Sequence, residues 1–193
     1  MRKLPFLVIA CLSLSISWAQ EKFTASKLGL KVGVNYFNQH VESGRQKVKT
    51  DYKPQVVFGF FNLIDLGTNW QFQPEFLLEN MGSKDDSFST RNTYLTIPLL
   101  LKYSSKSIGI YAGPQAGLLL SGKITSDFFP EQNVKDAYKS IDLAGIIGTD
   151  YTFSKRWMLS ARYHIPFNNI LKDAGPGNSI KNKGFQLTIG VVF

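Results

Sequence analysis

Regular alternation of apolar and polar side chains is the feature of this sequence that most constrains its fold. At the C-terminal end, every second residue from Phe185 to Phe193 is apolar, and Gln186 and Thr188 lie between them. A period of two residues is typical of a β-strand whose two faces have different surroundings. No segment of useful length shows the period of an α-helix. The sequence therefore predicts an all-β fold.

Eight segments of this kind follow one another, separated by polar stretches that contain Gly and Pro. We expect strands at 27–37, 55–64, 70–81, 93–103, 108–121, 140–151, 157–165 and 183–193. Most have about the 9–11 residues that a tilted strand needs to cross a bilayer. Residues 56–63 are apolar on both faces, so the sequence leaves the orientation of this strand open.

The connections between these segments indicate what surrounds the barrel. Alternation alone fits both a soluble barrel with an apolar interior and an outer-membrane barrel with an apolar exterior. Tight links at 65–69, 104–107 and 152–156 alternate strictly with long polar links at 38–54, 82–92, 122–139 and 166–182. This pattern is typical of a barrel with one end toward the periplasm and the other toward the exterior. We predict an eight-stranded antiparallel up-and-down transmembrane β-barrel with extracellular long loops and periplasmic termini.

Aromatic side chains support the membrane interpretation. They gather near the ends of the predicted strands, where interfacial girdles lie. The residues expected in these girdles are Tyr36, Phe37, Trp70, Tyr103, Tyr151, Phe153, Trp157 and Tyr163.

Residues 1–19 have the features of a signal peptide. A basic start at Arg2 and Lys3 precedes an apolar run over 4–16, and Ser17 and Ala19 are small residues before the expected cut. Cleavage after Ala19 would leave residues 20–193 as the mature barrel domain. Residues 8–11 (VIAC) resemble a lipobox, so lipidation of Cys11 is the alternative.

Four short motifs carry a family resemblance. They are NTYLTIPLLLKY at 92–103, FQPEFL at 72–77, AGPQAG at 112–117 and LSARY at 159–163. With them, the chain resembles PorT-like, porin-family outer-membrane β-barrel proteins of Gram-negative bacteria, which are small eight-stranded barrels. Phe193 is similar to the terminal aromatic residue that the barrel-assembly machinery reads. The resemblance implies a fold and an outer-membrane location, and it carries over no catalytic, cofactor or metal-binding residue.

The polar faces of the predicted strands would place their side chains in the lumen. Charges buried there should pair with opposite charges, and an eight-stranded barrel is just wide enough for its side chains to fill it. We expect a structural hydrogen-bonded plug, with a gated or narrow conductance as the alternative. The expected inward set is Lys31, Asn35, Gln71, Gln73, Glu75, Glu79, Lys102, Gln115, Asp142, Asp150, Arg162 and His164.

The predicted loops are basic, in a chain of net charge +8. The first contains Arg45, Lys47, Lys49 and Lys53, and the last region contains Lys172, Lys181 and Lys183. Lipopolysaccharide phosphates and outer-membrane lipid are the expected partners, through screened attraction. No motif supports nucleic-acid binding.

Other constellations are weaker. Asp85 and Asp86, with Ser83 and Ser87, could offer oxygens to Ca²⁺, but without EF-hand spacing they indicate a solvated turn.

Two histidines, His40 and His164, lack the spacing of metal ligands. His40, Glu42 and Ser43 could form a catalytic site at the outer rim of the barrel, but short polar loops contain such residues by chance. The sequence therefore predicts a non-enzymatic, monomeric outer-membrane protein that anchors surface loops for structural or binding work. A narrow transport pore and a rim-site lipid-modifying enzyme are the alternatives.

Overall fold

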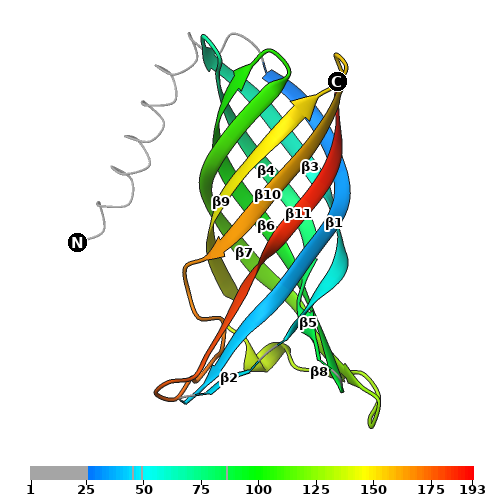
Figure 1. The fold of residues 1–193 in the computed structure, drawn as a ribbon, viewed down its shortest axis with the longest axis vertical. Coiled ribbons are helices and arrows are strands. Elements are labelled where there is room, and N and C mark those ends of the chain that lie inside the picture. The colour runs from blue at the N-terminus through cyan, green and yellow to red at the C-terminus, as the bar shows by residue number, and fades with distance from the viewer. Residues whose placement is uncertain (1–25, 45, 49, 86) are drawn as a thin grey trace, which may run out of the picture.

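Eight long strands close into one ring in the computed structural model, which describes residues 26–193 except positions 45, 49 and 86 (Figure 1). All paired neighbours are antiparallel, and β1 pairs with both β3 and β11, which closes the ring. The strands are β1 (Ser26–Ser43), β3 (Asp51–Gly67), β4 (Trp70–Met81), β6 (Phe88–Ser105), β7 (Ile108–Ser126), β9 (Ile141–Thr152), β10 (Trp157–Pro166) and β11 (Ser179–Val192). The predicted eight-stranded up-and-down barrel is confirmed. The expected signal peptide, with Cys11, lies outside the described residues.

Short elements gather at one end of the barrel, which we call the long-loop end (Figure 1). They are β2 (Gln46–Val48), β5 (Ser83–Lys84), β8 (Gln132–Asn133) and the 3-10 helix η1 (Lys135–Ala137). The opposite end, which we call the short-turn end, carries the tight links and the C-terminus (Figure 1). In the described part of the chain, no helix has the length and apolar character needed to cross a membrane.

Several strands are longer than the sequence pattern predicted. β1, β3, β6 and β7 have 18, 17, 18 and 19 residues. Their predicted boundaries at the long-loop end were wrong because the apolar alternation stops before the backbone ladder does. For example, β1 still pairs with β11 at Glu42 and Ser179. As a result, the predicted long connection 82–92 shrinks to 82–87 between β4 and β6.

The two faces of β3, which the sequence left open, are settled by burial. Val57 and Phe61 are buried in the lumen, whereas Phe58 and Phe60 are more than half exposed on the outer surface. The strand is apolar on both faces because its inward residues help to close the lumen.

One of the predicted girdle residues is misplaced. Tyr36 is on the outside and stacks on Tyr52 with ring centroids 5.3 Å apart. Phe37 is buried inside the barrel, so its assignment to the girdle was wrong. Successive side chains of a strand point to opposite faces, and two adjacent aromatic residues therefore cannot both face lipid.

Candidate functional site

Three polar contacts inside the lumen join β1 to β4 and β5. β1 and β4 are the two neighbours of β3 in the barrel. The contacts join Lys31 Nζ to Glu75 Oε1 (2.6 Å), Asn35 Nδ2 to Glu79 Oε2 (3.1 Å) and Ser83 Oγ to Gln39 Oε1 (3.3 Å). The partners are 44 positions apart in every case. This constant offset arises because β1 and the segment from β4 into β5 run in the same direction and each contributes every fourth residue to the contacts.

The contact nearest the short-turn end is an ion-pair cluster around Glu75. Its carboxylate accepts from Lys31 Nζ at 2.6 Å, Arg162 Nη1 at 2.8 Å and Gln73 Nε2 at 2.6 Å. All four side chains are buried. Two cations therefore face one carboxylate in a site without access to bulk water. Charge-assisted hydrogen bonds of this kind are stronger than neutral ones.

A second ion pair lies in the same lumen. Lys102 Nζ is 2.8 Å from Asp150 Oδ2, and both side chains are buried. The expectation that the interior charges pair is confirmed for these residues and for Lys31, Glu75 and Arg162. It is wrong for Glu79 and Asp142, which have no ion-pair partner among the described residues.

The next polar cluster, around Glu79, is held by neutral donors. Oε2 accepts from Asn35 at 3.1 Å and Gln186 at 2.9 Å, and Oε1 accepts from Thr96 at 2.6 Å and Gln115 at 3.1 Å. Within the described residues, no Lys, Arg or His nitrogen lies within ion-pair distance of this carboxylate. The donors come from β1, β11, β6 and β7, so Glu79 connects strands from several sides of the barrel.

A third polar cluster lies nearer the long-loop end. Asn182 Nδ2 donates to Asp142 Oδ2 at 2.9 Å, and Gln39 Nε2 donates to Asn182 Oδ1 at 3.2 Å. Gln39 Oε1 also accepts from Thr90 at 3.0 Å. This chain of contacts joins β9, β11, β1 and β6 beneath the loops.

Apolar clusters lie on either side of the Glu75 and Glu79 clusters along the barrel. Toward the long-loop end, Phe37, Met81, Tyr94 and Leu119 pack together with Tyr138. Burial raises the pKa of Tyr138, which keeps its phenol neutral.

Toward the short-turn end, Phe61, Leu63 and Met158 pack together with Val192. Lys31 Nζ lies 4.9 Å from the centroid of the Phe61 ring, within the range of a cation–π contact. The Glu75 and Glu79 clusters are therefore enclosed between two apolar layers.

Most of the predicted inward residues are buried as expected. Gln71 is only half-buried, and its Nε2 donates to Asp65 Oδ1 at 2.8 Å near the short-turn end. Sequence reasoning missed other buried polar residues, several of them because they fall in predicted loops. The missed residues are Gln39, Gln55, Ser83, Asn92, Thr96, Ser160, Asn182, Gln186 and Thr188. It also missed the apolar clusters, for which the doubly apolar strand 56–63 was the available signal.

The rim constellation has the wrong order for nucleophilic catalysis. Of the expected rim residues, His40 and Glu42 are in contact, with His40 Nε2 3.3 Å from Glu42 Oε1. The hydroxyl that donates to Glu42 Oε2, at 3.1 Å, belongs to Ser179, which was not part of the expected group. The carboxylate thus lies between the imidazole and the hydroxyl. A Ser–His–acid triad requires the imidazole in the middle, where it can take the hydroxyl proton.

In the 82–87 connection, Asp85 stabilises the turn through side-chain contacts with the backbone. Asp85 Oδ1 accepts from the backbone N–H groups of Ser87 at 2.9 Å and Phe88 at 2.7 Å. Asp86 lies outside the described residues. In the described part of the chain, no group of three or more His, Cys, Asp or Glu side chains could hold a metal ion.

Only some of the predicted basic loop residues fall within the described part of the chain. Arg45 and Lys49 lie outside the described residues, whereas Lys53 belongs to β3 and donates to Ser89 Oγ at 2.7 Å and to the Thr90 carbonyl at 3.1 Å. Burial lowers the pKa of Lys53, and the nearby positive charges of Arg91 and Lys84 lower it further. Three cations therefore share one part of the long-loop end.

Comparison with known proteins agrees with this architecture. Among solved structures, the chain is similar to Neisserial surface protein A (TM-score 0.56, 11% identity, 88% of this chain and 99% of that one). It is also similar to Ail, the attachment invasion locus protein of Yersinia pestis (TM-score 0.51, 14% identity, 88% of this chain and 100% of that one). At these identities the likeness shows the fold alone. No curated protein sequence matches the chain.

The family comparison goes further than the fold. The model of the outer membrane protein β-barrel domain matches residues 18–172, which is most of the chain. The finer PorT-like assignment stays a prediction. The chain belongs to the outer membrane protein β-barrel family and is an outer-membrane protein.

Proposed function

We propose that this protein is a closed, non-conducting barrel that anchors its long-loop end on the cell surface for binding. The observation that supports the proposal is the packing of side chains in the lumen. The charged clusters of Glu75 and Glu79 lie between the apolar cluster of Phe37 and Tyr94 and the apolar cluster of Phe61. An ion crossing this interior would have to displace paired charges and pass two apolar layers, which is costly.

Planar-bilayer recording tests the closed barrel. The wild-type protein should give no discrete openings. The variant F37A/Y94A, which removes two large side chains of one apolar cluster, is the matched comparison, and openings in this variant alone would support that cluster as the seal. Discrete, reproducible openings of the wild type would contradict the proposal and favour the narrow pore.

For the binding role, we propose phosphate groups of lipopolysaccharide as the partner of the long-loop end. Lys53, Lys84 and Arg91 place positive charge together there, and Lys84 and Arg91 are exposed. The structure of Ail was solved in complex with the heparin analogue sucrose octasulfate, a polyanion. Because that likeness extends to the fold alone, the basic side chains of this chain carry the proposal.

Binding to phosphorylated and dephosphorylated lipid A tests this partner. Lys84→Glu should weaken binding to the phosphorylated form, and raising the salt concentration should weaken wild-type binding because exposed charges are screened. Lys27→Glu reverses one charge at the short-turn end and is the matched control. Equal effects of the two variants, or equal binding of both lipid A forms, would contradict the proposal.

A further inference from the structure

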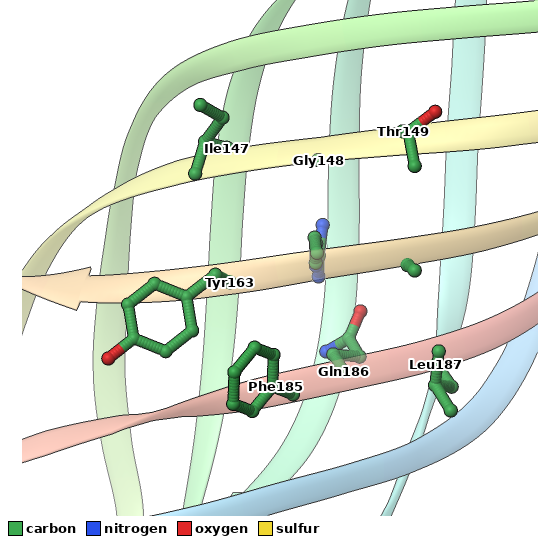
Figure 2. A pocket seen from close by; sticks show the side chains of 9 residues that line it. Ile147, Gly148, Thr149, Tyr163, Phe185, Gln186 and Leu187 are labelled. Carbon is green, nitrogen blue, oxygen red and sulfur yellow. The ribbon is translucent and has the colours of Figure 1, made fainter.

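The outer surface of the barrel carries a groove formed by three adjoining hollows. The first, of about 570 Å³, begins at the tight turn between β6 and β7 and extends along Tyr103 and Ile110. The second, of about 520 Å³, shares Tyr103 and Ile110 with the first. The third, of about 270 Å³, shares Ile147 and Gly148 with the second (Figure 2). We call this continuous feature the β7–β9 groove.

The groove forms where small side chains lie among large ones. Ala112 is exposed on β7 and pairs with Ile147 of β9, so a methyl group lies where neighbouring positions carry large side chains. Farther along, the rings of Tyr163 and Phe185 lie side by side at one edge of the third hollow, with centroids 4.8 Å apart (Figure 2). The groove is therefore lined mainly by apolar groups and has the form of a channel on the face that lipid covers.

Exposed basic and hydroxyl groups border the groove at its short-turn end. Lys106 and its neighbours Ser105 and Ser107 line the first hollow and are exposed. The backbone N–H of Thr152 donates to the Ser107 carbonyl at 2.7 Å, which brings the next turn, with exposed Lys155, alongside.

Aromatic rings mark the same level of the barrel. Tyr103 and Tyr151 both line the first hollow, and amphipathic rings are favoured at the headgroup level of a bilayer. The mouth of the groove is thus cationic at headgroup depth, and its interior is apolar at acyl-chain depth.

We propose that the β7–β9 groove binds one anionic phospholipid. The phosphate lies beside Lys106 and the serine hydroxyls, and an acyl chain lies along Ala112 and Ile110. Charge complementarity selects the anionic headgroup, since each basic residue near a lipid surface favours anionic lipid by about fivefold. With the long loops outside the cell, this lipid lies in the periplasmic leaflet, and that placement rests on the proposed orientation of the barrel. The groove itself does not depend on the orientation.

Trp70 provides the reporter, because it lines the second hollow and packs on Tyr103 with ring centroids 5.2 Å apart. In the variant W18F/W157F it is the only tryptophan of the chain. The full chain is reconstituted in phosphatidylcholine vesicles that contain a small fraction of brominated phosphatidylglycerol or, separately, of brominated phosphatidylcholine. Brominated phosphatidylglycerol should quench Trp70 several-fold more efficiently.

Two substitutions separate the parts of the proposal. Lys106→Glu should remove the preference for phosphatidylglycerol, and Ala112→Phe should reduce quenching by filling the groove. Ala116→Phe is the matched control, because Ala116 is exposed on the same strand but does not line the groove. Folding of each variant is verified by the gel mobility of the unheated barrel.

Equal quenching by both lipids, or equal effects of Ala112→Phe and Ala116→Phe, would overturn the proposal. The vesicles carry the same lipids in both leaflets, so the outcome does not depend on the orientation of the barrel. Protease cleavage of the long loops on intact cells tests orientation separately, and the two failures are therefore distinguishable.

Discussion

Glu75 and Glu79 lie four residues apart on the same face of β4, yet their surroundings differ in kind. Glu75 faces two cations, Lys31 and Arg162, at 2.6 and 2.8 Å. Glu79 is surrounded by four neutral donors from four strands. Both carboxylates are buried. One is therefore stabilised by opposite charge and the other by hydrogen-bond dipoles.

The difference shows what each carboxylate contributes to the barrel. Glu75 supplies the negative charge shared by two cations in a site that they could not occupy alone, because an unpaired buried charge is costly. Glu79 instead serves as an acceptor that joins amide and hydroxyl groups of strands far apart in the sequence. Removing charge at the two positions should therefore have unequal consequences.

The largest effect is expected for Glu75→Gln. This change removes the one negative charge that Lys31 and Arg162 share, and breaking a buried pair in this way costs about 3–5 kcal/mol. Reversible urea unfolding in lipid vesicles measures the free energy. A cost below that of Glu79→Gln would show that the cations are not held by Glu75.

Leu99→Arg places a charge on the lipid-facing side of the barrel, where the hydrocarbon offers no counter-charge. Leu99 is 43% exposed on the outside of β6, and an arginine near the bilayer midplane of a barrel costs about 2–4 kcal/mol. Leu66→Arg is the matched control near the short-turn end, where the cost should fall to about 0–1 kcal/mol. Equal unfolding free energies for the two variants would mean that Leu99 is not at membrane depth.

A smaller effect is expected for Glu79→Gln. When the NH₂ group of the new amide takes the place of Oε1, the Thr96 hydroxyl can turn to accept from it, whereas the Gln115 amide loses its acceptor. One unsatisfied buried group costs about 1–3 kcal/mol. The same unfolding measurement applies. A cost as large as that of Glu75→Gln would show that charge, rather than hydrogen bonding, determines the role of Glu79.

The smallest effect on stability is expected for deletion of Phe193. Its side chain is 69% exposed, and its backbone N–H donates to the Leu28 carbonyl at 2.9 Å. Refolding in detergent should change little, whereas outer-membrane abundance in cells should fall if the assembly machinery reads this residue. Equal loss in both measurements would make Phe193 a packing residue, and no loss in either would contradict the targeting role.

Sequence reasoning predicted the barrel and most of its inward polar face, because alternation marks each strand wherever one side meets lipid. It could not predict the neutral environment of Glu79, since Thr96, Gln115 and Gln186 converge on it only after closure. Phe37 shows a second limit. An apolar residue on the inward face has the same sequence pattern as one that faces lipid, so only its neighbours across the lumen distinguish the two.

The accessibility of a single cysteine shows whether the lumen is sealed. Cys11 is the only cysteine of the chain, so the C11S variant accepts a reporter at any other position. Thr96→Cys places a thiol beside Glu79, where the native residue is fully buried, and Ser87→Cys places one in the 82–87 connection. With a small charged methanethiosulfonate reagent, the thiol at position 87 should react rapidly and the thiol at 96 only after unfolding. Comparable rates at the two positions in the folded barrel would mean that a charged reagent reaches Glu79 and that the lumen is open.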